Sequence, residues 1–251
     1  MNEMATWIAH LRIAEILYEA FNIIDPNYFS IGSLAPDYDI PDNIRSSVPS
    51  VPRDSHFRIS DEGNWGVADL EFYRRYIGSI GKLSEDSLRL SFLLGYAFHL
   101  VTDNVWDKQV FQPIRARFQE RFESDPNFIW EVKRDWYGID FDYVHTNTDA
   151  GCWQVFLKCQ YDHDYLDFMP QKAVQENLER IRDFYHNKDN VLERWIGNSP
   201  NIYLSVSDMD GFVEDTGKQL IRIYQFLVKN DVAKTNYLSV LELPIDGDTI
   251  E

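Results

Sequence analysis

The sequence predicts an all-α protein, with a single multi-helix domain over residues 1–251. Apolar residues recur at helical spacing over long stretches, and no convincing run of alternating strand residues is present. Hydrophobic residues make up 44% of the 251 residues, which is typical of a folded globular chain with a sizeable core.

The first helix is predicted from Met4 to Ile24, because His10, Ala14 and Leu17 recur on one face. The pair Asp25-Pro26 is expected to end it. A long proline-rich loop is predicted to follow from Tyr28 to Trp65, with prolines at 36, 41, 49 and 52. Loops of this length are uncommon in compact domains unless they carry a function or are disordered.

The remaining helices are predicted from the same periodicity and from their proline and acidic starts. They cover residues 68–80, 84–122 with a kink or break at Pro113, 125–136, 147–160, 170–186 and 207–229. The acidic tail after Leu243 is expected to fray.

The net charge of −17 disfavours a nucleic-acid partner and stable docking on anionic lipid. No segment offers about twenty apolar residues in a row, so no transmembrane helix is expected. The N-terminus lacks a basic region followed by an apolar stretch, which predicts a cytoplasmic location. Cys152 and Cys159 are interpreted as two buried thiols, since their spacing within one helix suits a disulfide poorly.

The stretch GYAFHLVTDNVWD, residues 95–107, places His99, Asp103 and Asp107 in an apolar helical run. His99 and Asp103 are four residues apart and therefore share one helix face. Burying a polar group without a partner costs roughly 2–7 kcal/mol, so a compensating partner is expected. An isolated HxxxD is more often a core histidine bonded to the aspartate one turn away.

Three other residues shift this interpretation. His10 lies on the apolar stripe of the first helix, Asp37 follows Leu34-Ala35-Pro36, and His56 lies in the loop sequence DSHFR. Each has an ordinary explanation by itself, as a core histidine, a turn former and a solvated loop residue. In order, however, they give His, then APD, then SHF, then HxxxD.

This ordered set resembles the zinc-dependent phospholipase C family, an all-α fold that also includes fungal single-strand nucleases. The resemblance covers residues 4 to 110 best. It implies that Asp37, His56, His99 and Asp103 bind one zinc ion. It also implies that His10 adds a ligand to a neighbouring metal, with Asp103 bridging the two.

Imidazole and carboxylate donors suit zinc, with manganese, iron or nickel as alternatives, and one or two ions are expected. The resemblance implies a phospholipase C-like phosphodiesterase that hydrolyses a phosphoric ester with metal-activated water. Asp37 would act as catalytic base as well as ligand. A small-molecule phosphoester is the expected substrate.

The chain also departs from the family pattern. The trinuclear enzymes carry a second histidine shortly after HxxxD and a later HxxxE pair, whereas this chain has Lys108-Gln109-Val110 there and no HxxxE after His99. One site is therefore expected to be complete and a second partial. Asp107 is a candidate for orienting the metal ligands or for an extra ligand, and Arg58 is a candidate for substrate binding through a forked contact. The alternative is a non-catalytic or binding domain that retains a single structural metal.

Overall fold

The computed structural model describes residues 4–22, 24–38, 55–59, 66–83, 86–186 and 197–245. Within these ranges the protein is helical, with only two isolated β-bridges, Arg58–Val67 and Leu166–Met169, so the all-α prediction is confirmed. The α-helices are α1 (Trp7–Ala20), α2 (Pro26–Gly32), α4 (Asp69–Phe72), α5 (Ile80–Leu83), α6 (Ser87–Trp106), α7 (Gln112–Arg117), α8 (Gln119–Ser124), α9 (Phe128–Thr146), α10 (Gly151–Lys158), α11 (Gln171–His186) and α13 (Val206–Lys229). Shorter turns are the 3-10 helices η1 (Ala35–Asp37), η5 (Val232–Lys234) and η6 (Val240–Glu242), and the π-helical η2 (Tyr73–Ile77) and η3 (Asp107–Phe111).

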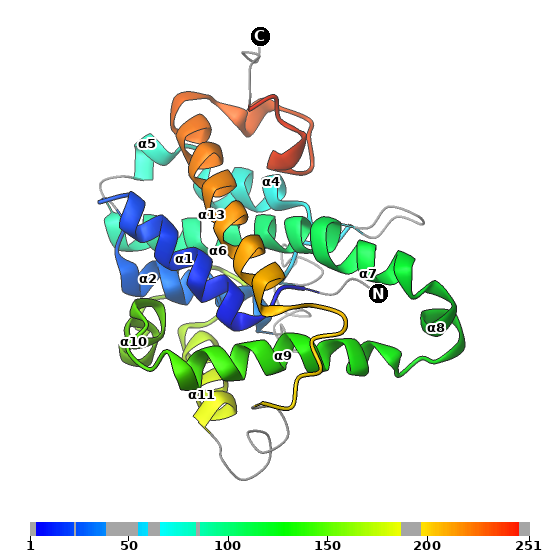
Figure 1. The fold of residues 1–251 in the computed structure, drawn as a ribbon. Helices are drawn as coiled ribbons and strands as arrows, with labels where there is room; N and C mark the ends of the chain where they lie inside the picture. The colour runs from blue at the N-terminus through cyan, green and yellow to red at the C-terminus, as the bar shows by residue number, and fades with distance from the viewer. Residues whose placement is uncertain are drawn as a thin grey trace.

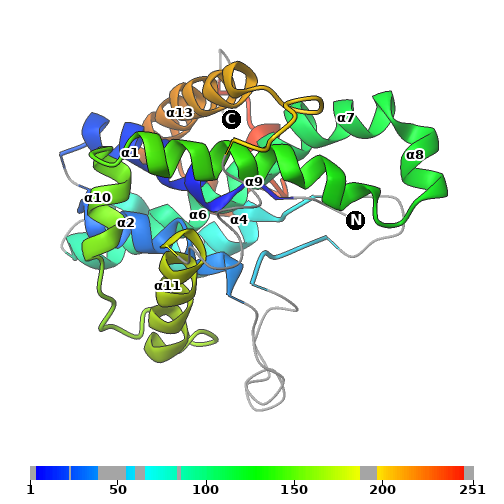
Figure 2. The same cartoon turned by 60° about the horizontal axis from the view of Figure 1, so that its bottom comes forward.

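The buried helix α6 forms the centre of the fold. It packs against α2, while α13 crosses over both α1 and α6 (Figure 1). Helices α9 and α10 pack against α1 as well (Figure 2). No helix in the described part of the chain is long and apolar enough to span a membrane.

The first helix is shorter than predicted. It begins at Trp7 because the Thr6 side chain accepts a hydrogen bond from the Ala9 backbone N–H, and it ends where Phe21 becomes extended. The predicted loop is wrong at its start, since α2 and η1 occupy residues 26–37. Asp25 caps α2 and Pro26 occupies its first turn, so this pair begins a helix as well as following one. The other loop prolines, at 41, 49 and 52, lie outside the described residues.

Helices α2 and α6 cross in backbone contact. A Cβ atom at Gly95 would lie 2.3 Å from the carbonyl oxygen of Phe29, and one at Gly32 would lie 2.1 Å from that of Phe92. No larger residue fits at this crossing. The close approach brings the end of α2 beside the middle of α6.

The predicted helix over 84–122 is interrupted near Pro113. Helix α6 ends at Trp106, the π-helical turn η3 follows, and Pro113 sits in the first turn of α7. Helix α9 extends to Thr146, ten residues beyond the predicted end at Trp136. Residues 246–251, which hold most of the acidic tail, lie outside the described residues.

Candidate metal centre

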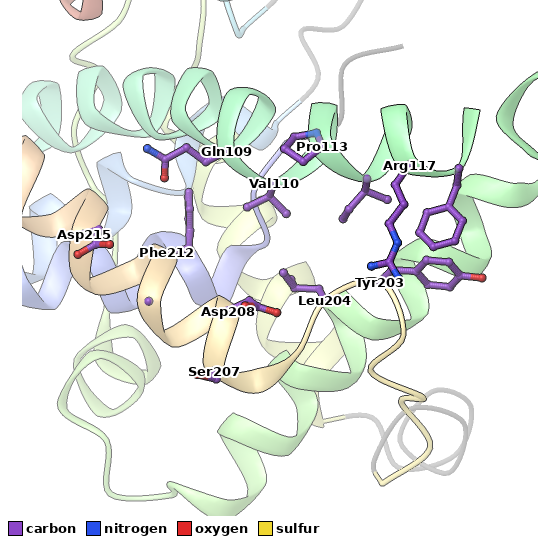
Figure 3. A pocket seen from close by; sticks show the side chains of 13 residues that line it. Gln109, Val110, Pro113, Arg117, Tyr203, Leu204, Ser207, Asp208, Phe212 and Asp215 are labelled. Carbon is purple, nitrogen blue, oxygen red and sulfur yellow. The ribbon is translucent and has the colours of Figure 1, made fainter. Parts of the chain in front are cut away.

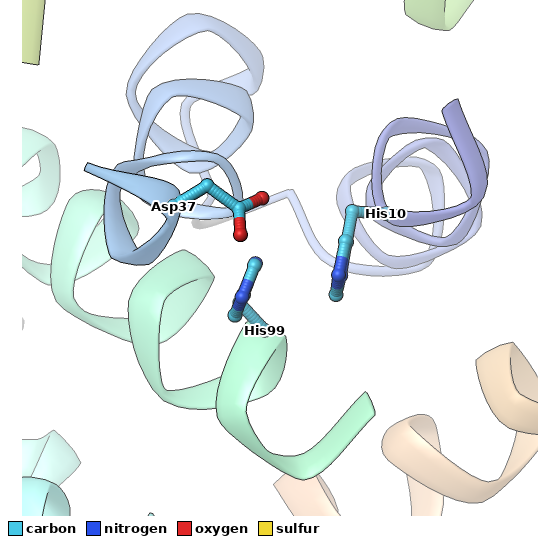
Figure 4. Close-up of side chains that lie close together, drawn as sticks. All are labelled: His10, Asp37 and His99. Atoms are coloured by element: carbon cyan, nitrogen blue, oxygen red, sulfur yellow. The ribbon is translucent and has the colours of Figure 1, made fainter. Parts of the chain in front are cut away.

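Four segments bring the five proposed ligands together inside the protein. His10 comes from α1, Asp37 from η1, His56 from the segment 55–59, and His99 and Asp103 from α6. Figure 4 shows the His10 and His99 rings side by side below the Asp37 carboxylate, and the two rings stack with their centroids 3.8 Å apart. All five side chains are nearly shielded from solvent, and Asp37 is the most exposed, at 10%.

The donor atoms fall into two overlapping groups. His10, Asp37 and His99 form one, and His56, His99 and Asp103 form the other, with the donor atoms in each within 4.8 Å of one another. The two groups share His99, so all five residues belong to one compact centre. This is the convergence that the ordered motifs predicted, although ligation itself stays a prediction.

Asp103 lies between the histidines. Its Oδ1 is 3.3 Å from His10 Nε2, whereas its Oδ2 is 3.2 Å from His99 Nε2 and 3.8 Å from His56 Nε2. Asp37 Oδ1 lies 3.3 Å from His56 Nε2. The two oxygens of Asp103 therefore face different histidines, as expected of a bridging carboxylate.

The tautomer of His99 follows from its backbone partner. Its Nδ1 lies 2.8 Å from the carbonyl oxygen of Ser33, which can only accept, so Nδ1 carries a proton. Its Nε2 then lies 3.3 Å from His56 Nε2. On the far side of the His56 ring, Nδ1 is 3.3 Å from the Ser55 hydroxyl. Backbone and hydroxyl partners on Nδ1 are the usual supports of histidines that ligate metals through Nε2.

Three atoms in the centre have no hydrogen bond among the described residues. These are His10 Nε2, Asp37 Oδ2 and Asp103 Oδ2, all buried. Buried polar atoms are nearly always satisfied, and unsatisfied ones indicate an additional partner. Imidazole nitrogens and carboxylate oxygens around one point are a donor set for a zinc-type cation, so the residues fit the predicted metal.

The electrostatics of the centre favour charged carboxylates. Burial would raise the pKa of Asp103, but His99 and His10 outweigh it and hold this pKa well below its ordinary value. Burial likewise opposes the lowered pKa of Asp37, which His99 and His56 bring about. Burial would lower the pKa of His99, but Asp103 and Asp37 raise it to about 9. The carboxylates are thus anionic, and a metal that binds His99 through Nε2 would displace the proton that this raised pKa places there.

The N-terminal segment before α1 contributes hydrogen bonds to the centre and its surroundings that the sequence motifs did not indicate. The Ala5 backbone N–H donates to Asp103 Oδ1 at 3.2 Å. The Thr6 hydroxyl donates to Asp140 Oδ1 of α9 at 2.8 Å. Asp140 therefore holds this segment beside the centre. Because Thr6 and Asp140 are 134 positions apart, the sequence alone did not indicate this contact.

The other predicted site residues lie outside the two groups. Arg58 is exposed, with its Nη2 3.3 Å from Met4 Sδ. The Asp107 carboxylate accepts from Gln112 Nε2 at 3.1 Å. Gln109 lines a cavity of about 460 Å³ between α7 and α13, whose lining includes none of the five proposed ligands (Figure 3). The roles of Arg58 and Asp107 stay predictions.

Comparison with known proteins agrees with the motif-based resemblance. Residues 9–115 match the model of a family described as zinc dependent phospholipase C. This segment contains all five proposed ligands, so the resemblance is confirmed over it. No curated protein matched the chain, and no solved structure did either.

Proposed function

Since residues 9–115 carry the zinc-dependent phospholipase C pattern, we propose that this protein is a metal-dependent hydrolase of a phosphoric ester. The observation that carries the proposal is the set of unsatisfied, buried carboxylate and imidazole atoms on Asp37, Asp103 and His10. Residues His56 and His99 complete the proposed donor set. A zinc ion bound there would supply Lewis-acid stabilisation of charge and lower the pKa of water.

Asp37 is the residue we propose as base. Its Oδ2 has no hydrogen bond from the described residues, and nearby His99 and His56 lower its pKa against the effect of burial, so the carboxylate is ionised and able to accept a proton. In the proposed reaction the oxygen of water bonds to phosphorus and the bond to the leaving alcohol breaks. Asp37 Oδ2 accepts the proton that water loses and passes it to the leaving oxygen, so that the alcohol leaves neutral and the carboxylate is regenerated.

A small phosphodiester or phosphomonoester is the proposed substrate. The net charge of −17 opposes the approach of a long polyanion such as nucleic acid. Arg58 follows His56 by two residues and is proposed to contact a substrate oxygen, since guanidinium groups bind phosphate through paired hydrogen bonds.

The alternative is a structural metal in a non-catalytic domain. The near-complete burial of the donors favours it, because a closed site with four protein ligands stabilises a fold without leaving room for substrate. The centre joins α1, η1, the segment 55–59 and α6, which a metal would hold together.

Elemental analysis with a turnover assay separates these two functions. We expect the purified protein to hold zinc and to hydrolyse bis(p-nitrophenyl) phosphate. His99→Ala and Asp37→Ala should each lower zinc content, melting temperature and turnover. His163→Ala is the matched control, since His163 pairs with Asp162 at the surface outside the donor groups.

Unchanged zinc content in both His99→Ala and Asp37→Ala would rule out the proposed centre. One tightly held zinc per chain without turnover of phosphodiester or phosphomonoester would favour the structural alternative.

A further inference from the structure

Among the five proposed ligands, Asp37 has the most exposed side chain. The Asp37 side chain is 10% exposed, whereas His99 and Asp103 are 0% and 2% exposed. A substrate that reaches the centre therefore meets the surroundings of Asp37 first. One cationic side chain from the C-terminal half of the protein lies there.

That side chain is Arg180 of α11. Its Nη2 donates to the backbone carbonyl oxygen of Asp37 at 3.4 Å and to Asn177 Oδ1 at 2.6 Å. Its guanidinium carbon lies 5.0 Å from the ring centroid of Trp7, over the aromatic face. Arg180 is exposed, yet three neighbours hold its charged group beside the residue proposed as base.

Asn177 fixes this arrangement. It is buried, and its Nδ2 donates to the carbonyl oxygen of Leu34 at 3.1 Å while its Oδ1 accepts from Arg180. The amide therefore ties α11 to the turn that carries Asp37. An arginine held in this way loses less conformational entropy when it binds a ligand.

The charge balance of the protein makes such a cation important for the proposed substrate. The chain carries a net charge of −17, and a bound divalent ion would balance only the two carboxylates of the centre, Asp37 and Asp103. A phosphate group would be repelled unless a local positive charge opposed this field. Both hydrogen bonds between Arg180 and the described residues use Nη2, so the donors of Nη1 and Nε remain for a ligand.

We propose that Arg180 is a binding residue for the phosphoryl oxygens of the substrate, presented by Asn177 and Trp7 at the Asp37 side of the centre. This inference rests on the proposed function for its substrate class. It assigns the anion contact to a residue that lies 143 positions from Asp37 in the sequence and outside residues 9–115.

Binding of inorganic phosphate to the zinc-loaded protein tests the proposal without requiring turnover. We expect isothermal titration calorimetry to show phosphate binding by the unmodified protein and at least about tenfold weaker binding by Arg180→Gln, because a charge-assisted contact is lost. Zinc content should be the same in both. Arg180→Lys keeps the charge and should recover part of the affinity.

Arg134→Gln is the matched control, because Arg134 is exposed on α9 and the substitution changes net charge equally. Its phosphate affinity should equal that of the unmodified protein. The proposal is overturned by absent phosphate binding in the unmodified protein, by unchanged affinity in Arg180→Gln, or by an equal loss in Arg180→Gln and Arg180→Lys. It is also overturned if Arg180→Gln loses zinc, since the residue would then support the fold of the centre.

The two proposals fail separately. Arg180-dependent phosphate binding without turnover of any phosphoester supports the anion contact and contradicts the hydrolase. Turnover of bis(p-nitrophenyl) phosphate that is unchanged in Arg180→Gln supports the hydrolase and contradicts the anion contact.

Discussion

Asp135 on α9 and Asp103 on α6 are both buried carboxylates, but they differ in their partners. Asp135 Oδ1 accepts from the Asn201 N–H at 2.9 Å, and its Oδ2 accepts from the Tyr203 N–H at 2.6 Å. Asp103 Oδ1 accepts from the Ala5 N–H, whereas its Oδ2 has no hydrogen bond from the described residues. The first carboxylate is satisfied by backbone donors of the fold, whereas the nearest neighbours of the second are imidazole nitrogens, with His99 Nε2 3.2 Å from Oδ2.

Asp140 extends the comparison to electrostatics. Its oxygens accept from the hydroxyls of Thr6 and Tyr185, at 2.8 and 2.6 Å. Burial raises the pKa of Asp140 to about 7 although these hydrogen bonds lower it, whereas the histidines hold the pKa of Asp103 low. Neutral hydroxyl donors thus accompany a carboxyl that tolerates a proton, and imidazoles accompany one that stays charged. The difference distinguishes carboxyls that serve the fold from carboxyls suited to a cation.

The largest effect is expected when the satisfied carboxylate is removed. Asp135→Ala leaves the backbone N–H groups of Asn201, Tyr203 and Leu204 without their acceptor. Tyr203 and Leu204 are buried, and each buried donor without a partner costs about 1–3 kcal/mol, so the free energy of unfolding should fall by about 4 kcal/mol. Urea denaturation measures this, and the stabilisation by added zinc should be unchanged. A loss below about 1 kcal/mol would contradict the structural role.

Asp103→Asn should give the opposite pattern, a loss of the stabilisation by zinc without a large loss of stability in its absence. The variant keeps Oδ1 as acceptor for the Ala5 N–H but loses the negative charge. Zinc at one hundred times its dissociation constant should stabilise the unmodified protein by about 2.7 kcal/mol, and this increment should disappear in the variant. Denaturation with zinc and with chelator measures both quantities. Equal stabilisation of the two proteins by zinc would remove Asp103 from the centre.

The raised pKa of Asp140 gives a pH-dependent effect of intermediate size. Because the folded-state pKa of about 7 exceeds the ordinary aspartate pKa of 3.8, the contribution of Asp140 to stability is complete below about pH 4 and is lost as pH rises through 7. Asp140→Asn resembles the protonated carboxyl and lacks this dependence. Between pH 5 and 7 the unmodified protein should lose about 2 kcal/mol relative to the variant. Parallel stability curves for the two would contradict a buried, protonated Asp140.

The candidate centre was predictable because its motifs are local and ordered. His99 and Asp103 lie four residues apart in a helix and therefore share one face. The order of His10, Asp37 and His56 along the chain matched a known pattern. The same local reasoning misassigned residues 26–37. Pro26 stops a preceding helix and also suits the first turn of a new one, and only the Asp25 cap distinguishes the two.

The contacts that support the centre could not be predicted from local patterns. Asp140, Asn177 and Arg180 lie on α9 and α11, more than 130 residues from the segments they contact. The local sequence around Asn177 and Arg180, or around Asp140, does not indicate which distant residue each one contacts. Their assignment depends on how α9 and α11 pack against the N-terminal half.

The smallest effect is expected from the Ser55 hydroxyl, which lies beside Nδ1 of His56. Ser55→Ala removes the partner of His56 Nδ1 at 3.3 Å, while the Ser55 carbonyl still accepts from the Tyr96 hydroxyl at 2.5 Å. Losing such a support weakens metal binding by roughly tenfold, or about 1.4 kcal/mol, because the ring is less well oriented. Competition with a chromophoric chelator measures the zinc affinity. Ser33→Ala is the control, since its hydroxyl donates to the Ser30 carbonyl and its own carbonyl remains for His99. Equal affinities in the two variants would mean that packing alone orients His56. The centre would then differ from the satisfied carboxylates only in the oxygens of Asp37 and Asp103 that make no hydrogen bond.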